Sequence, residues 1–200
     1  MVQSIDYPEL MHLLTKPLEP RTRALIAFQY ASAARIGELL PYTHKIKDKE
    51  TDRLVYSHYT NGLLKSNFFM GVNKITWRLP NFKTKSKKRL IKEPFVLKEE
   101  KVLWDIITSW LANCSEQVFE LREARARELI RNVISPYSSH VLRKSRGTHL
   151  ADLFGYNAYE IREALGHSSL ETGIHYVSTV NSEKKMRAKL IEMMKMVMNR

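Results

Sequence analysis

The sequence predicts a mainly α-helical domain with a small antiparallel β-sheet between Leu54 and Ile91, an α+β fold. Two observations lead to this class. Apolar residues recur at helical spacing in the N-terminal and C-terminal parts of the chain, whereas a central stretch alternates apolar and polar residues as a half-buried strand does. With 200 residues, 44% of them hydrophobic, the chain is long enough to bury a substantial core.

Two helices are expected at the N-terminal end. Asp6 and Pro8 are typical of a helix start, and the leucine pattern that follows ends before Pro17. A second helix is expected to begin near Thr22. The next run, ARIGELL at residues 34–40, places an arginine and a glutamate among apolar residues. Charges in such a setting are costly unless they are paired or used.

The central part of the chain is expected to form the sheet. Residues 42–66 are polar and mixed, which favours a loop with a short strand at Leu54–Tyr56. Residues 68–79 alternate between apolar and polar side chains and are therefore expected to form a strand. A lysine-rich turn after Pro80 is expected to join it to a second strand at Arg89–Ile91.

Helices are expected again over residues 98–112 and 117–133, followed by a helix that opens at His140. Gly166 is a suitable helix stop. Near the C-terminus, within 181–200, an apolar stripe at helical spacing predicts a terminal helix and consists of Leu190, Met193, Met194 and Val197.

The charge of the chain points to a polyanionic partner. Lys and Arg number 33 against 21 Asp and Glu, a formal net charge of +12, and nucleic acid is the commonest partner of such a surplus. No run approaches the roughly 18 apolar residues of a spanning helix, and the N-terminus lacks a secretory pattern. Cys114 is the single cysteine, which excludes an internal disulfide framework and a Cys-based metal site. We expect a cytoplasmic, DNA-associated protein without a membrane partner.

The groups with the most suggestive chemistry lie close together in the sequence and are His140, Arg143, His167 and Tyr176. A phenol, with an ordinary pKa of about 10, attacks only with a base and cationic neighbours nearby. Guanidinium groups donate paired hydrogen bonds that suit phosphate oxygens. The pattern therefore suggests attack of a tyrosine on a phosphodiester. From the residues alone, each histidine could equally cap a helix or satisfy a turn.

Four ordered segments resemble the catalytic domain of the tyrosine recombinase family (phage integrase, Xer-type). These segments are ARIGEL at 34–39, FKTKSKKRLI at 82–91, HVLR at 140–143 and LGHSSLETGIHY at 165–176. The last two are specific, whereas an isolated Arg-x-Gly-Glu would be weak evidence. Together they span nearly the whole chain.

The resemblance implies that Tyr176 attacks the scissile phosphate of double-stranded DNA and forms a 3′-phosphotyrosine, without metal, cofactor or ATP. It implies that Arg35 and Arg143 bind the phosphate, that Glu38 supports Arg35, and that His140 helps to remove the tyrosine proton. In such a site the two arginines neutralise the charge that gathers on the phosphorus.

The remaining roles follow from the same resemblance. His167 would hydrogen-bond the phosphate, and Lys83 of the hairpin segment would protonate the leaving 5′-oxygen, with Lys85 as the alternative. A further set of basic residues is either in contact with the DNA backbone or part of a solvated face: Lys85, Lys144, Arg146 and Arg162.

The resemblance also implies a domain organisation. Residues 1–180 correspond to the catalytic domain, and 42–70 are expected to hold an insertion because the distance from Arg35 to Lys83 is long. We expect no N-terminal core-binding domain in this chain. The helix in 181–200 either packs on its own subunit or docks on a neighbouring protomer of a homo-oligomer, a tetramer on DNA.

Two other functions compete with site-specific recombination. A type IB topoisomerase shares this active-site chemistry but would relax DNA as a monomer without a defined site. A DNA-binding module with idle catalytic residues belongs to a different class, which the complete set of six residues disfavours. The target site and the cis or trans action of Tyr176 stay open.

Overall fold

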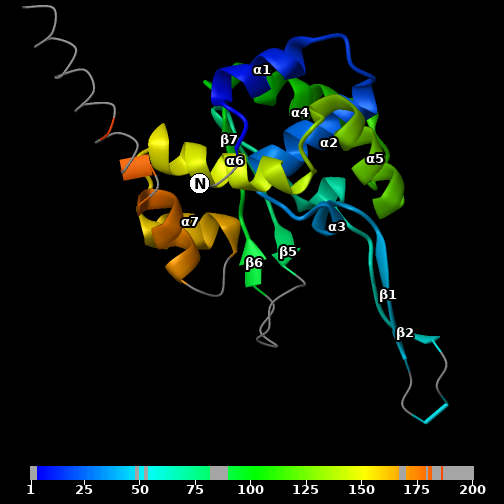
Figure 1. Ribbon diagram of the computed structural model, residues 1–200. Coiled ribbons are helices and arrows are strands. Elements are labelled where there is room, and N and C mark those ends of the chain that lie inside the picture. Colours follow the sequence, from blue (N-terminus) through cyan, green and yellow to red (C-terminus); the bar gives the residue numbers. More distant parts are fainter. Residues whose placement is uncertain are drawn as a thin grey trace, which may run out of the picture.

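The computed structural model describes residues 4–47, 50–51, 54–81, 90–166, 170–178, 180–181 and 186 (Figure 1). Within them, the chain forms a helical body from which two β-hairpins extend on the same side. This confirms the predicted class, mainly α with antiparallel β-structure. The described strands extend beyond the expected limits of Leu54 and Ile91, from Tyr42 to Leu97, and form three sheets rather than one. In the described part of the chain, no helix has both the length and the hydropathy needed to cross a membrane.

The body consists of helices α1 (Tyr7–Thr15), α2 (Pro20–Ala31), α3 (Ile36–Leu39), α4 (Lys101–Asn113), α5 (Glu123–Ile134), α6 (His140–Asp152) and α7 (Ala158–Leu165). A further helical segment covers 170–178.

Helix α2 forms the centre of the body and is buried on nearly all of its faces. Its start is fixed locally, because the Glu19 carboxylate accepts a hydrogen bond of 2.7 Å from the backbone N–H of Thr22. In its second half, Phe28 makes edge-on ring contacts with Phe119 at 5.3 Å and Phe68 at 5.8 Å. Strand β3 and the segment before α5 therefore pack on one helix.

The strands among the described residues form three separate antiparallel sheets. Strands β1 (Tyr42–Lys47) and β2 (Leu54–Thr60) form the first, and β5 (Leu79–Asn81) with β6 (Leu90–Lys92) form the second. The third has the order β3 (Phe68–Met70), β4 (Lys74–Trp77), β7 (Phe95–Leu97), and a short 3-10 helix, Lys65–Asn67, precedes it.

Three stretches differ from the sequence prediction. The polar stretch expected as a loop contains β1, which exists through its pairing with β2 rather than through alternation of its own. Residues 68–79 are split into strands by a turn that leaves Val72 84% exposed. Helix α5 begins at Glu123 rather than near 117, because Val118 is drawn into the core and its N–H donates to the Leu63 carbonyl.

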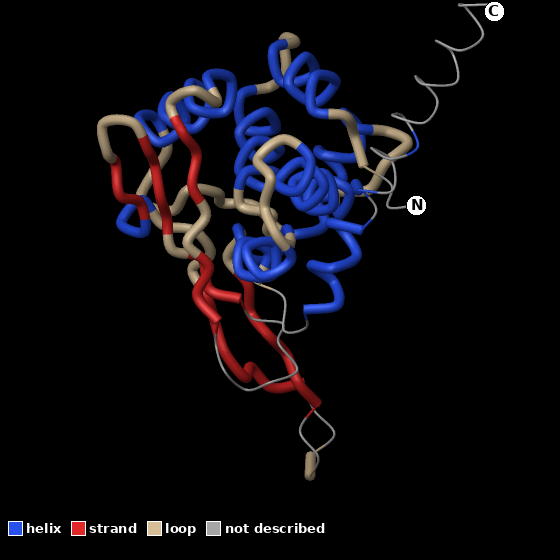
Figure 2. Tube along the Cα trace, turned by 90° about the vertical axis from the view of Figure 1, so that its left-hand side faces the viewer, coloured by secondary structure: helices blue, strands red, loops and turns tan. Residues whose placement is uncertain are grey.

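Strands β1 and β2 form an arm that projects from the body (Figures 1 and 2). The chain leaves the body after Leu40 and returns at Leu63, whose N–H donates to the Leu39 carbonyl at 3.1 Å. Gly62 has a φ of 68°, and a Cβ at this position would lie 2.4 Å from the Leu40 carbonyl carbon. The base of the arm is therefore closed by tight backbone contact that only glycine permits.

In the part of the chain that the structure describes, buried apolar residues form two clusters. The larger fills the space between α2, its neighbouring helices and the sheets. The smaller lies between α6, α7 and the segment 170–178, and it consists of Ala33, Leu150, Ile161, Leu165 and Tyr176.

Candidate active site

The segment ARIGEL forms an ion-paired turn at the start of α3. The backbone N–H of Arg35 donates to Glu38 Oε2 at 2.9 Å, and its guanidinium Nη1 donates to Glu38 Oε1 at 3.0 Å. The Glu38 side chain is 3% exposed, whereas that of Arg35 keeps 32% of its surface exposed. The glutamate therefore holds the arginine from the inside, with the guanidinium accessible from the surface.

A buried lysine contacts the same carboxylate. Lys92, the last residue of β6, donates from Nζ to Glu38 Oε2 at 2.9 Å, and its side chain is 1% exposed. Burial acts to raise the pKa of Glu38, but the charge and hydrogen bond of Lys92, together with Arg143, hold that pKa below its ordinary value. Glu38 is therefore a carboxylate at neutral pH.

The pattern of the sequence does not single out Lys92. A lysine at the end of a hairpin is ordinarily solvated, and its neighbour Ile91 is 64% exposed, so hydropathy assigns the two side chains to the wrong sides. The available signal is indirect: a buried Glu38 that supports Arg35 can accept a further cation.

Arg143 of α6 brings a second guanidinium to this region. It is 2% exposed, and it donates from Nη1 to the Ala33 carbonyl and from Nη2 to the Leu165 carbonyl, both at 2.6 Å. Burial lowers the pKa of Arg143 to about 10, partly opposed by Glu38, so the group stays charged at neutral pH. Ala33 has a φ of 46°, a left-handed conformation that is uncommon for alanine.

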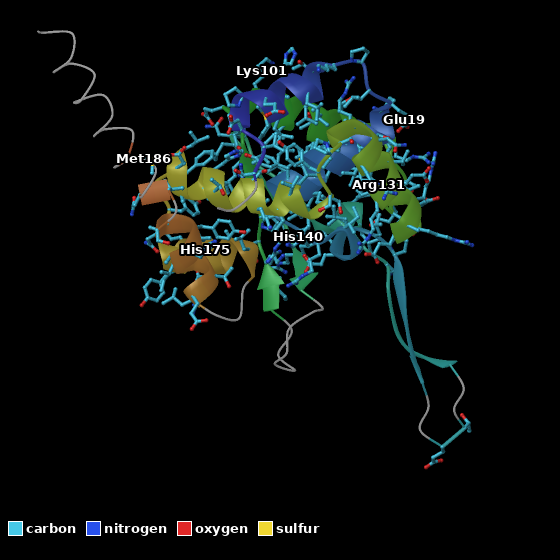
Figure 3. All side chains as sticks on the ribbon, viewed as in Figure 1. Glu19, Lys101, Arg131, His140, His175 and Met186 are labelled. Carbon is cyan, nitrogen blue, oxygen red and sulfur yellow. The ribbon has the colours of Figure 1, made fainter. Side chains whose placement is uncertain are left out.

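His140 is the first residue of α6 and lies on the side of the body from which β5 and β6 extend (Figure 3). Although part of the residue faces solvent, the surrounding protein lowers the pKa of His140 below 6.5, and the charges of Arg143, Lys144 and Arg35 lower it further. The imidazole is therefore neutral at pH 7 and able to accept a proton.

Tyr176 lies in the helical segment 170–178 and is 6% exposed. Its ring packs on α6 at Gly147, where a Cβ would lie 2.9 Å from two ring carbons. Burial raises the pKa of Tyr176, and the charge of Arg143 opposes that rise. The phenol is therefore protonated at neutral pH, within electrostatic reach of Arg143.

Three expected site residues, Lys83, Lys85 and His167, lie outside the described residues. Lys144 and Arg162 are partly exposed, so both are accessible to a ligand.

Arg146 requires a correction to its role as a candidate contact of the DNA backbone. It is 3% exposed, and its guanidinium donates to Glu100 at 2.7 Å and lies over the rings of Tyr30 and Phe154. The charge of Arg146 is already paired with Glu100 inside the fold, so the structure does not present it to a duplex. The error arises because α6 is buried on more than one face, so a basic residue on it can point inward.

The described residues thus bring together two arginines, an imidazole and a phenol from α3, α6 and 170–178, with a buried lysine–glutamate pair behind them. Two guanidinium groups suit the oxygens of a phosphate. A neutral imidazole suits transfer of the phenol proton. The arrangement fits nucleophilic attack on a phosphodiester.

A family model described as the phage integrase family matches residues 2–183. The chain belongs to this family. No curated protein sequence matches this phage integrase family member significantly.

Solved structures share the fold of this phage integrase family domain. XerH site-specific recombinase bound to palindromic difH substrate in a post-cleavage complex gives a TM-score of 0.62 at 18% identity, over 96% of this chain and 54% of that chain. XerA recombinase gives 0.62 at 17% identity, over 94% and 65%. The catalytic domain of bacteriophage HP1 integrase gives 0.53 at 17% identity, over 94% and 95%. This chain therefore spans 54–65% of the length of the two Xer recombinases.

Proposed function

We propose that this phage integrase family domain is a site-specific recombinase that cleaves and rejoins DNA strands through Tyr176. One observation carries the proposal: Tyr176 packs on α6 within reach of the Arg143 charge, and Arg143 and Arg35 both act on Glu38. Residues far apart in the sequence thus form one cationic site beside a phenol. Such a site stabilises the charge that develops on a phosphate under attack.

The reaction proceeds by exchange of one phosphodiester for another. Tyr176 Oη attacks the phosphorus and forms a P–O bond, the bond from phosphorus to the 5′-oxygen breaks, and a 3′-phosphotyrosine remains. The phenol proton passes to His140, whose lowered pKa leaves it unprotonated at pH 7. The leaving 5′-oxygen takes a proton from an acid, a role that we assign to Lys83, with Lys85 as the alternative.

The energy of the cleaved phosphodiester bond is conserved in the phosphotyrosine linkage, so strand joining is the reverse of strand cleavage. A 5′-hydroxyl attacks the phosphotyrosine, releases Tyr176 and restores a phosphodiester, with no net change in the number of phosphodiester bonds. Arg35, Arg143 and His167 are proposed to hold the phosphate through both steps. The step balances without an external energy source or a metal ion, which is the basis for proposing neither.

The proposed partner is double-stranded DNA, engaged by a homo-oligomer, most simply a tetramer. The net charge of +12 supports an anionic partner, and Lys144 and Arg162 are proposed backbone contacts. Among the structures with this fold, XerH is bound to its difH substrate and the Tn1549 transposon integrase to a circular intermediate DNA. We further propose that 1–180 form the catalytic unit with an insertion in 42–70. Residues 181–200 are proposed to dock on a neighbouring protomer.

The first test asks for a covalent adduct and finds the target site in the same experiment. A pool of nicked duplexes with randomised sequence is incubated with the wild-type protein, with Tyr176→Phe and with Tyr159→Phe. Tyr159 is 61% exposed and serves as the matched control. We expect a denaturant-resistant adduct from the wild type and from Tyr159→Phe, and none from Tyr176→Phe. The DNA recovered from the adducts should carry a common sequence.

Other outcomes separate the rival functions. An adduct that persists in Tyr176→Phe identifies another nucleophile and contradicts the assignment. Adducts on DNA without common sequence, together with relaxation of supercoiled plasmid, indicate a topoisomerase. Tight DNA binding without any adduct, at any nick position, indicates a binding module.

A further inference from the structure

Lys92 occupies a position that stability alone does not favour. Its ammonium is buried at 1% exposure at the end of a short two-stranded hairpin, while Ile91 beside it is 64% exposed. Burying the Lys92–Glu38 pair removes the hydration of both charges, and a pair of apolar side chains of similar volume would fill the same space without that loss. The position therefore calls for an explanation in terms of what the ammonium contacts.

The contacts of Glu38 give that explanation. Its Oε2 atom accepts the backbone N–H of Arg35 at 2.9 Å and Lys92 Nζ at 2.9 Å, while Oε1 accepts Arg35 Nη1 at 3.0 Å. Because two donors hold Oε2, the carboxylate group keeps one orientation. Its Oε1 atom is thereby held facing the Arg35 guanidinium. Such a contact lowers the number of rotamers that a long, partly exposed arginine side chain samples.

We propose that Lys92 is a positioning residue of the active site, which acts through Glu38 to hold the Arg35 guanidinium where it meets a phosphate. Lys92 does not contact the substrate in this role, because its amine points to Glu38 in the interior. The meaning of the phosphate contact rests on the proposed function, whereas the Lys92–Glu38–Arg35 linkage is a property of the folded chain.

The charges around Lys92 make its contribution depend on pH. Glu38 of α3 faces it with opposite charge, and Arg143 of α6 and Arg35 face it with like charge. Burial lowers the pKa of Lys92 to about 8, partly opposed by Glu38. Lys92 is therefore charged below pH 8 and loses that charge on the mildly alkaline side, so the contribution of the ammonium is largest near neutral pH.

A double-mutant cycle tests the linkage. The variants are Lys92→Met, Glu38→Gln and the double variant, with Ile91→Met as the matched control on the same strand. The measurements are the single-turnover rate of adduct formation on a duplex recovered from the randomised pool, the affinity for that duplex, and the melting temperature. Near pH 7 we expect Lys92→Met to lower the rate by about 10–100-fold, as a small misplacement of a catalytic group does.

The pattern across the cycle distinguishes positioning from mere support of the fold. We expect the double variant to be no slower than Glu38→Gln, because Lys92 acts through that carboxylate. The DNA affinity of the Lys92→Met variant should match that of the wild type. The Ile91→Met control should form the adduct at the wild-type rate. The ratio of the wild-type rate to the Lys92→Met rate should shrink as pH rises through 8. Additive losses in the double variant, or a wild-type rate in Lys92→Met, overturn the proposal.

A second measurement does not depend on DNA cleavage. The Nε–Hε signal of Arg35, assigned by its loss in Arg35→Lys, is followed by ¹H–¹⁵N NMR in the wild type and in Lys92→Met, with inorganic phosphate as the added probe. We expect a resolved signal that shifts with phosphate in the wild type and is broadened or lost in Lys92→Met. An unchanged Arg35 signal overturns the proposal, even if the wild type forms no adduct. A changed signal supports the linkage in that case, while the missing adduct counts against the proposed function alone.

Discussion

His149 shows how a single buried titratable residue couples this fold to pH. It lies on α6 at 5% exposure, and its Nδ1 atom forms a hydrogen bond of 2.8 Å with the Tyr30 hydroxyl of α2. Burial, together with the nearby charge of Arg146, lowers the pKa of His149 to about 4. The neutral form is therefore the one that the folded state accepts.

We expect stability to fall as pH drops from about 6.5 to 4. The unfolded chain binds a proton at the ordinary histidine pKa, whereas the folded chain does not, so the contribution of His149 is full above 6.5 and lost toward 4. The difference between the ordinary histidine pKa of 6.5 and the pKa of about 4 in the folded chain corresponds to about 3 kcal/mol of unfolding free energy. Urea unfolding at pH 7 and pH 4.5 measures it, in the wild type and in His149→Gln.

The glutamine variant should lose most of this pH dependence, because an amide can still bond Tyr30 but does not titrate. His12→Gln, at an exposed position in α1, is the control and should behave as the wild type does. Equal pH dependence in His149→Gln and the wild type would assign the effect to other groups.

At the scale of elements, the contact between α6 and the segment 170–178 sets the place of the nucleophile. A Cβ on Gly147 would lie 2.9 Å from two carbons of the Tyr176 ring and 3.1 Å from Leu165 Cδ1. Both neighbours are buried in the same small cluster, so an added methyl group would force one of them to shift. Gly147 therefore fixes how closely the two helical segments approach.

We expect Gly147→Ala to displace the tyrosine. The added methyl group overpacks the cluster, which should lower the unfolding free energy by about 1–3 kcal/mol even though alanine favours a helix. Adduct formation should slow more than DNA binding weakens. Thr148→Ala, one residue along α6, is the control, and an equally slow Thr148 variant would mean that α6 as a whole is sensitive.

The chain enters and leaves the arm of β1 and β2 at the backbone contact between Leu39 and Leu63, and we expect the body to fold without the arm. Replacing 42–60 with two glycines leaves the contact between Leu39 and Leu63 in place. Because a shorter loop lowers the entropy cost of closure only slightly, the unfolding free energy should change by less than about 1 kcal/mol. Urea unfolding followed by circular dichroism tests this, and loss of a cooperative transition would show that the arm packs on the body.

At the scale of the whole molecule, what the sequence predicts well is what depends on neighbours in the chain. The start of α1 next to Asp6 and Pro8 and the opening of α6 at His140 are predicted from the local sequence pattern, and the structure has both. The burial of Lys92 and Arg146 depends on partners in distant elements, Glu38 and Glu100, which no local pattern identifies. Strand β1 is missed for the same reason. Its own sequence shows no alternation of apolar and polar residues, and it forms a strand because it pairs with β2.

The division into two apolar clusters leads to a last prediction about the whole molecule. Tyr176 belongs to the smaller cluster, which has far fewer buried residues than the one around α2. Regions with less buried apolar contact open locally at a lower free energy than the global unfolding. We therefore expect the amides of α7 to exchange with deuterium faster than those of α2, by on the order of tenfold or more.

Hydrogen exchange followed by mass spectrometry measures both helices in one experiment. Gly147→Ala should accelerate exchange in α7, because the overpacking falls within the smaller cluster, and exchange in α2 should accelerate by no more than the loss of global stability allows. Equal rates in α7 and α2 would mean that the tyrosine segment opens only with the whole fold. Faster exchange in α7 would instead show that the smaller cluster opens locally. The proposed chemistry needs such an opening, because the Tyr176 phenol, at 6% exposure, has to be uncovered before it meets a phosphate.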